Sequence, residues 1–154
     1  IVAWVVYNPV MNESFVAERG SGTYFNDRRV RVAARTRLAE CVVATGIPHL
    51  GRGPHEEYLS ELRGVMRSAA GVRRCGSAAL DLAWLAAGRF DAFWEHGLYP
   101  WDIAAGILLV QEAGGLITDD NGRGDMLNRG SVIAANSTVH GLLTTALKEA
   151  RIAA

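Results

Sequence analysis

The segment from Phe90 to Asp120 reads FDAFWEHGLYPWDIAAGILLVQEAGGLITDD, and it joins a strand-like run, an acidic loop, a helical pattern and a second strand. Its first run, Phe90–Trp94, is apolar and aromatic, as many strands are. Pro100 suits the first turn of a helix, and a glycine pair is typical of the position just past a helix end. The segment therefore predicts a strand-to-helix junction flanked by two carboxylates, Glu95 and Asp102.

Strand and helix patterns largely alternate from Cys41 onward, whereas the residues before it form only short strand patterns separated by turns. Such alternation is typical of layered α/β domains. We therefore expect an α/β/α domain with a mixed sheet at residues 37–154, preceded at residues 1–36 by an antiparallel β-meander from the N-terminal domain of a longer protein. The predicted strands are Ile1–Tyr7, Ser14–Glu18, Thr23–Phe25, Arg28–Val32, Cys41–Thr45, Val72–Cys75, Phe90–Trp94, Leu116–Thr118 and Ser131–Ala135, and the predicted helices are His55–Ala70, Gly76–Ala87, one that begins near Pro100, and Val139–Ala150.

The composition is that of an ordinary globular domain, with 154 residues of which 49% are hydrophobic. Lys and Arg number 16, as do Asp and Glu, so no basic surplus points to nucleic acid or to an acidic membrane surface. No apolar run reaches the roughly 18 residues that a membrane span needs. Cys41 and Cys75 are far apart, so we expect two free thiols in a reducing compartment, the cytoplasm. Because the chain opens in a strand-like run without methionine, we expect a piece of a longer protein.

Two junctions between a strand and a helix carry the candidate chemistry. Asp102 lies in a first helical turn, where a carboxylate either complements the helix dipole or serves as an oxygen ligand for Mg²⁺. Glu95 ends a strand and is either solvated or a hydrogen-bond acceptor for a ligand. Gly76, Ser77 and Ala78 open a second helix, where Ser77 is a candidate N-cap and free N–H groups suit anions or hydroxyls. Because both junctions belong to one sheet, a single pocket could collect all five residues.

Of two further acids, one is excluded from that pocket and the other has a structural interpretation. Glu112 lies ten residues after Asp102 on the same helix, or about 15 Å away, whereas paired catalytic metals are about 4 Å apart. We expect it to have a local partner such as an arginine. Asp81 is an isolated acid in a largely apolar helix, and we expect it to pair with an arginine as well.

The remaining polar features have plain structural interpretations. The run Asp119–Gly122 resembles a calcium loop, but Arg123 stands where an oxygen ligand is required, so we expect a solvated turn. Four histidines show no metal-ligand spacing, and we expect His96 to lie in an exposed loop. For Arg73 and Arg74 we favour a structural ion pair or a subunit contact over a phosphate contact. We expect three tryptophans to lie in the core: Trp84, Trp94 and Trp101.

The string P-W-D-x-A-A-G-x-x-L-V-x-E-A-G-G, at Pro100–Gly115, resembles the C-terminal signature of the inositol monophosphatases, which are magnesium-dependent, lithium-sensitive phosphatases of small metabolites. The opening meander is also similar to a family segment, with Asp27 where the family often has glycine. The resemblance extends from Ile1 to about Ala154 and corresponds to the C-terminal portion of a family protein. The family's D-P-(I/L)-D-G-T loop, which lies in its N-terminal half, does not occur in this sequence.

The resemblance implies roles for the five residues. Asp102 would bind the second Mg²⁺, Glu95 would accept hydrogen bonds from substrate hydroxyls, and the segment Gly76–Ala78 would contact the substrate mainly through its backbone. The implied reaction is hydrolysis of a phosphate monoester by a homodimer, and without the N-terminal ligands we expect this chain alone to be inactive. The bacterial character of WEHGLYPWDIAAG favours inositol monophosphate. The alternatives are fructose-1,6-bisphosphatase, histidinol phosphatase, 3′-phosphoadenosine-5′-phosphate phosphatase and, in another class, a non-catalytic interaction protein.

Overall fold

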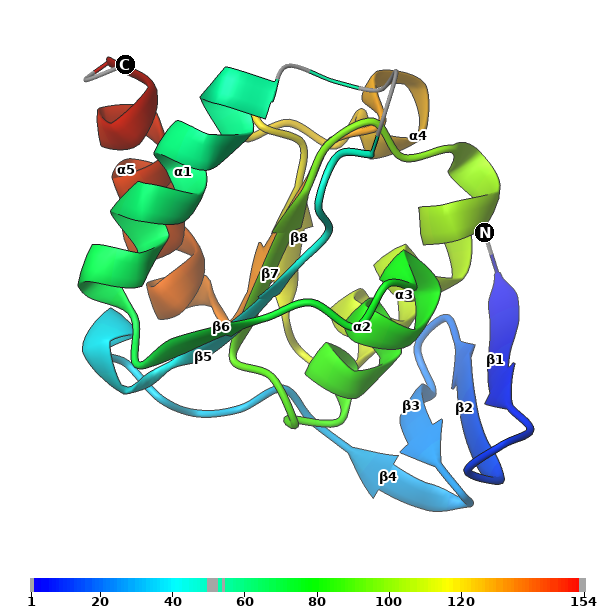
Figure 1. Ribbon diagram of the computed structural model, residues 1–154. Helices are drawn as coiled ribbons and strands as arrows, with labels where there is room; N and C mark the ends of the chain where they lie inside the picture. Colours follow the sequence, from blue (N-terminus) through cyan, green and yellow to red (C-terminus); the bar gives the residue numbers. More distant parts are fainter. Residues whose placement is uncertain (1, 50–52, 54, 153–154) are drawn as a thin grey trace.

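The computed structural model describes residues 2–49, 53 and 55–152. The first part of the chain forms an antiparallel sheet whose strands follow one another in sequence order (Figure 1). Its turns are tight, and Asn26 and Asp27 both adopt positive φ between the last two strands, as Asn and Asp tolerate better than most residues. These strands confirm the predicted meander and are β1 (Ala3–Asn8), β2 (Glu13–Glu18), β3 (Gly22–Phe25) and β4 (Arg28–Val30).

The second sheet is mixed and has the strand order β6-β5-β7-β9-β8. Strands β5, β6 and β7 are parallel to one another, whereas β9 runs antiparallel to β7 and β8 runs antiparallel to β9. The predicted fold class is therefore confirmed, and the carboxyl ends of three neighbouring strands meet at one edge. The bounds are β5 (Val42–Thr45), β6 (Gly71–Arg73), β7 (Ala92–Glu95), β8 (Leu116–Thr118) and β9 (Val132–Ala135), with a short 3-10 turn at Leu38–Glu40 before β5.

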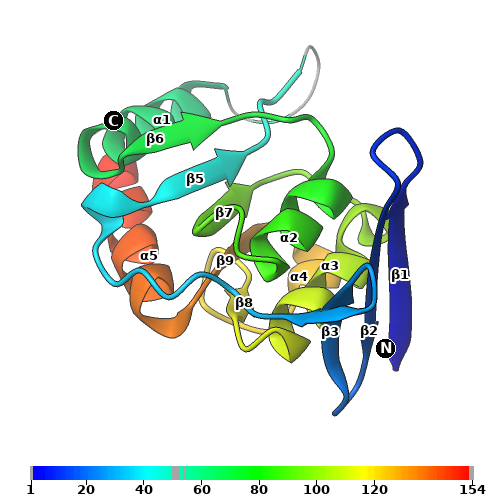
Figure 2. The ribbon, with the colours of Figure 1, turned by 90° about the horizontal axis from the view of Figure 1, so that it is seen from below.

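Two pairs of helices cover the mixed sheet (Figures 1 and 2). Helices α1 (His55–Ser68) and α5 (Ser137–Ile152) pack together on one face. On the other face, α2 (Ala78–Ala86) and α3 (Pro100–Glu112) lie between the two sheets, and their apolar side chains form one core with β2 of the meander. The two layers of helices explain why α2 and α3 are apolar nearly all round, whereas α1 and α5 are amphipathic.

Close contact between α2 and α3 depends on a glycine. A Cβ at Gly106 would overlap the side chain of Leu82, so the absence of a side chain lets the two helices approach. The short helix α4 (Met126–Arg129) was not predicted, because a single turn of four residues is too short to show a helical period. None of the helices that the described residues form is long and apolar enough to cross a membrane.

The predicted environment of the tryptophans is partly wrong. Trp94 is fully buried and Trp84 is half-buried, but Trp101 is 74% exposed and stacks on Tyr99 with the ring centroids 4.7 Å apart. Trp101 is the second residue of α3, before the helix enters the core at Ile103, so its side chain faces outward. Cys41 is buried, Cys75 is exposed and both are free thiols, as predicted.

Candidate active site

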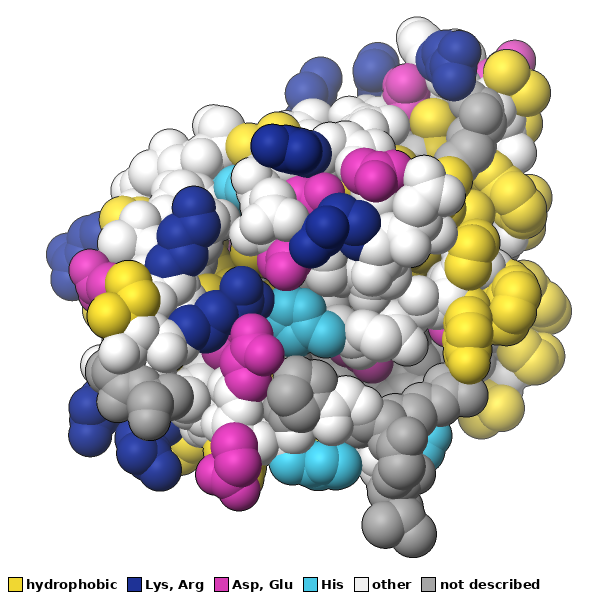
Figure 3. All heavy atoms as spheres, turned by 90° about the horizontal axis from the view of Figure 1, so that it is seen from above, with side chains coloured by type: hydrophobic (Ala, Val, Ile, Leu, Met, Phe, Trp, Pro, Cys, Tyr) yellow, Lys and Arg dark blue, Asp and Glu magenta, His cyan; other side chains and the backbone are white. Residues whose placement is uncertain are grey.

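A pocket of about 520 Å³ lies at the carboxyl ends of the three parallel strands. Its walls come from the segments that follow β5, β6 and β7 and from a fourth segment around Asp120, Arg129 and Ser131. Figure 3, which looks onto the upper side of Figure 1, shows acidic, basic and histidine side chains side by side near the centre of this face. In open α/β sheets this edge is where ligands commonly bind. The pocket brings together all five predicted site residues: Gly76, Ser77, Ala78, Glu95 and Asp102.

The junction before α2 is built by a glycine and a serine. Gly76 has a φ of +94°, which L side chains rarely adopt, and it turns the chain from β6 towards the helix. Ser77 is the predicted N-cap, because it is extended and its Oγ accepts the N–H of Leu80 at 3.5 Å. Ala78 and Ala79 line the pocket at the helix N-terminus, where the first N–H groups have no carbonyl of a preceding turn to bond. This end of α2 can therefore donate hydrogen bonds to an anion or a hydroxyl.

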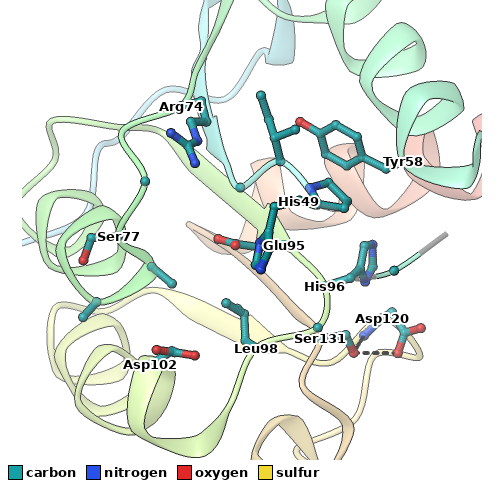
Figure 4. A pocket seen from close by; sticks show the side chains of 18 of the residues that line it. His49, Tyr58, Arg74, Ser77, Glu95, His96, Leu98, Asp102, Asp120 and Ser131 are labelled. Carbon is teal, nitrogen blue, oxygen red and sulfur yellow. Dashed lines mark hydrogen bonds between the residues drawn. The ribbon is translucent and has the colours of Figure 1, made fainter. Parts of the chain in front are cut away.

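Glu95 is the last residue of β7, and its carboxylate points into the pocket (Figure 4). The carboxylate packs directly against Gly46, where a Cβ would overlap it. Burial, and then the negative charges of Asp81 and Asp102, raise the pKa of Glu95 to about 7. Glu95 can therefore accept hydrogen bonds as a carboxylate above neutral pH and carries a proton below it.

Asp102 is the third residue of α3, and its Oδ2 accepts the backbone N–H of Tyr99 at 2.9 Å. This is half of a capping box, so the helix N-terminus fixes the orientation of the carboxylate. The side chain faces the same cavity as Glu95 (Figure 4). One oxygen thus has a structural role while the other faces the pocket.

The donor chemistry at Asp102 suits magnesium, which takes hard oxygen ligands and is often held by only one or two carboxylates plus substrate phosphate. The part of the chain that the structure describes contains no group of three or more His, Cys, Asp or Glu side chains arranged to hold a metal ion. The described residues therefore fit one side of a magnesium site and do not complete a ligand set.

Asp81 does not form the predicted arginine pair. It is 1% exposed, and neither of its carboxylate oxygens has a hydrogen-bond partner among the described residues. Burial raises the pKa of Asp81 to about 6, although the nearby Cys75 thiol and the positive charge of Arg74 oppose the rise. Asp81 follows Ser77 by one turn of α2, so this buried acid, which forms no ion pair with the described residues, lies near the helix end that lines the pocket. A single acid in an otherwise apolar helix was the signal in the sequence.

The hydrogen-bond partners of Glu112 are backbone N–H groups, and the charges of Arg19 and Arg29 act on it as well. Its two oxygens accept the N–H groups of Gly20 and Gly22 at 2.9 and 3.0 Å, and these bonds lower the pKa of Glu112. The turn between β2 and β3 is thereby attached to the C-terminal end of α3. Periodicity could not reveal this contact, because the residues are about ninety positions apart in the chain.

The solvated turn expected at Asp119–Gly122 is wrong for its first residue. Asp119 is fully buried, because one oxygen accepts the N–H groups of Asn121 and Arg123 at 2.9 and 2.7 Å and closes the turn on itself. Asp120 accepts from Ser131 at 2.8 Å and pairs with Arg129 at 3.1 Å, and all three side chains line the pocket.

Two other residues of the pocket, His96 and Arg74, do not have the environments expected from the sequence. His96 is not in a free exposed loop, because its Nε2 lies 3.0 Å from the buried carboxylate of Glu61. Arg74 lines the pocket (Figure 4) and forms no ion pair with the described residues, so the expected structural pair is not seen. The guanidinium of Arg73 donates to the carbonyl of Val72 at 2.9 Å.

The fold and the pocket define an α/β protein with a pocket lined by charged side chains at the carboxyl edge of its sheet. The chain belongs to the inositol monophosphatase family, whose model matches residues 1–152. It is 56% identical over 149 residues to the inositol-1-monophosphatase of Mesorhizobium japonicum, an alignment that covers 97% of this chain and 56% of the relative. It is 47% identical over 135 residues to the putative Nus factor SuhB of Neisseria meningitidis serogroup B, with coverage of 88% and 52%.

Among solved structures, the extragenic suppressor protein suhB of Bartonella henselae superposes with a TM-score of 0.93 at 57% identity. That superposition covers 96% of this chain and 57% of the other. The chain therefore spans about half the length of the relatives that it matches.

Proposed function

We propose that this chain is the C-terminal part of a magnesium-dependent phosphatase that hydrolyses small phosphate monoesters, with inositol monophosphate as the first candidate. The observation that supports this proposal most directly is the convergence of Glu95, Asp102 and the segment 76–78 on one pocket in a member of this family. In the proposed protein, residues 1–36 belong to the N-terminal domain and residues 37–154 form the C-terminal domain. A cytoplasmic homodimer and sensitivity to lithium are part of the same proposal.

The family resemblance gives each site residue a proposed role, and the geometry of the pocket is compatible with it. The Asp102 oxygen that faces the pocket would hold Mg²⁺, while the other remains bonded to Tyr99. Bound magnesium would supply Lewis-acid stabilisation of the phosphate and an activated water. Glu95 would accept hydrogen bonds from substrate hydroxyls, and the N–H groups at the start of α2 would donate to the substrate.

A phosphate-release assay tests the activity and the substrate together. We expect the full-length protein to hydrolyse inositol monophosphate faster than fructose 1,6-bisphosphate, histidinol phosphate or 3′-phosphoadenosine 5′-phosphate, and only with magnesium. Residues 1–154 alone should be inactive, because the D-P-(I/L)-D-G-T ligands are absent from them. Failure of the full-length protein on all four esters would refute the proposal.

The role of Asp102 has its own test. Asp102→Asn in the full-length protein should raise the magnesium concentration needed for half-maximal activity and sharply lower turnover, because the amide carries no charge for the cation. Asp27→Asn is the matched control, since Asp27 is exposed in the turn between β3 and β4 and has a φ of +62° that Asn tolerates. Identical magnesium titrations of the two variants would remove Asp102 from the metal site.

A non-catalytic interaction role is the second candidate. It is favoured by the 47% identity to a protein named as a putative Nus factor. If the full-length protein hydrolysed none of the four esters but bound a transcription protein stoichiometrically, this candidate would replace the first.

A further inference from the structure

Glu61 is a charged residue in the core, on α1 about one turn after the pocket-lining residues Glu57 and Tyr58. Glu61 is 0% exposed. Its carboxylate accepts the indole N–H of Trp94 at 3.1 Å and is bonded to His96 Nε2 at 3.0 and 3.1 Å, while Arg151 of α5 donates to Oε1. One carboxylate therefore joins α1 and α5 to the end of β7.

The two β7 donors flank Glu95 in the sequence. Successive side chains of a strand point to opposite faces. Trp94 and His96 both bond to Glu61, whereas the Glu95 carboxylate points into the pocket, which His96 also lines (Figure 4). Glu61 thus holds the residues immediately before and after the candidate substrate-binding carboxylate. Glu61 itself does not line the pocket.

Glu95 has little else to orient it. Its side chain makes no hydrogen bond with the part of the chain that the structure describes, and it rests against the bare backbone of Gly46. The chain turns sharply after His96 at Gly97, whose φ is +72°. The direction of the Glu95 side chain therefore depends on how firmly the backbone of residues 94–96 is held.

A buried ionised group is an inefficient way to stabilise a core, because apolar residues of similar volume often do as well or better. Burial would raise the pKa of Glu61, but the bonds and charges of His96 and Arg151 outweigh it and lower that pKa, so Glu61 stays ionised. Unlike leucine, a carboxylate accepts several hydrogen bonds with defined geometry, so it can fix the orientation of the groups that donate to it.

We propose that Glu61 is a positioning residue that orients Glu95 for substrate hydroxyls by holding Trp94 and His96. The inference rests on the proposed function, in which Glu95 binds those hydroxyls. It assigns a role in ligand recognition to a residue that does not itself line the pocket.

Three variants of the full-length protein separate positioning from general stability. The double variant Glu61→Leu/Arg151→Leu removes the acceptor together with the half-buried arginine that pairs with it. Arg151→Gln is the control, because it cuts the link to α5 and leaves both strand donors bonded to Glu61. Glu61→Gln is the conservative variant, since one amide oxygen at the Oε2 position can still accept from Trp94 and His96.

The measurement is KM for two substrates, inositol monophosphate and p-nitrophenyl phosphate, the second of which has no ring hydroxyls for Glu95. In the double variant we expect KM for inositol monophosphate to rise on the order of tenfold, as the loss of about one hydrogen bond implies. KM for p-nitrophenyl phosphate should stay within about twofold, kcat should change little for both, and Glu61→Gln should restore most of the loss. Equal changes for the two substrates, or an unchanged KM for inositol monophosphate, would overturn the inference.

A structural measurement covers the case in which the parent protein hydrolyses neither substrate, an outcome that would refute the proposed function alone. Crystal structures of the parent and the double variant then decide the role of Glu61. Displacement of the Glu95 carboxylate from Gly46 would support positioning, and an unmoved carboxylate would refute it. If the double variant does not fold, Trp94→Phe replaces it in both measurements, because it removes one of the two strand donors and Trp94 does not line the pocket.

Discussion

Replacing the buried acid Asp81 with asparagine should stabilise the protein at neutral pH and much less at acidic pH. Its pKa is raised from an ordinary value of 3.8 to about 6, so the unfolded chain loses this proton first and stability falls as the pH rises between those values. At about 1.4 kcal/mol per pKa unit, the ionised group costs the folded state about 3 kcal/mol near pH 7.5 and about 1 kcal/mol near pH 4.5. The stabilisation by Asp81→Asn should therefore be about 2 kcal/mol smaller at pH 4.5 than at pH 7.5.

Urea unfolding followed by tryptophan fluorescence, in EDTA at both pH values, measures this difference. The free-energy cost of burying the asparagine amide does not depend on pH, so it cancels when the two pH values are compared. Asp120→Asn is the control that should destabilise the protein at both pH values. Burial raises the pKa of Asp120, but Ser131 and Arg129 outweigh it and lower that pKa from 3.8, so the stabilisation by this carboxylate is lost only at a pH below both measurements. If Asp81→Asn changed the free energy of unfolding equally at both pH values, the pKa of Asp81 would not be raised in the folded protein.

Three further outcomes follow from the pocket and from α3. In magnesium-free protein the Glu95 carboxyl should titrate near pH 7 by ¹³C NMR. Asp81→Asn should lower the pKa of Glu95, since the Asp81 charge is one of the causes that raise it. A Glu95 pKa near 4.5 in the parent would contradict the burial of this group. Gly46→Ala should raise KM for inositol monophosphate, because the new methyl group takes the space of the Glu95 carboxylate; an unchanged KM would mean that this contact is dispensable. Glu112→Ala should lower the melting temperature, because two backbone N–H groups lose their acceptor. The control Glu40→Ala, which removes an exposed ion pair, should leave the melting temperature nearly unchanged. Equal melting temperatures of the two variants would count against the bond between Glu112 and the β2–β3 turn.

Local patterns were sufficient for the elements and for the location of the pocket. Period and turn chemistry act within a few residues, so the strands, the long helices and the N-cap at Ser77 could be predicted. The location of Glu95 and Asp102 followed from a topological argument, because both lie at the end of a parallel strand or just after it. Their roles came from family resemblance and remain proposals.

Contacts between distant segments were out of reach. Glu61 appeared as one more polar residue of an amphipathic helix, because its partners come from β7 and α5. Asp81 was given an arginine on the general rule that buried charges are paired, and the structure departs from that rule beside the pocket. Trp101 was placed in the core because of its size, although its position in α3 points it outward. In each case the sequence identified the residue but not the groups that surround it in the folded protein.

Helix α3 carries Asp102 in its first turn and Glu112 at its last residue, and Glu112 is bonded to the turn of the meander. A helix moves along its axis nearly as a rigid rod, so a displacement of the β2–β3 turn would be transmitted over about 15 Å to the pocket. Helix α3 thus links the β2–β3 turn to the candidate magnesium ligand through one continuous element. The alignment of the two sheets thereby becomes a determinant of the geometry at Asp102.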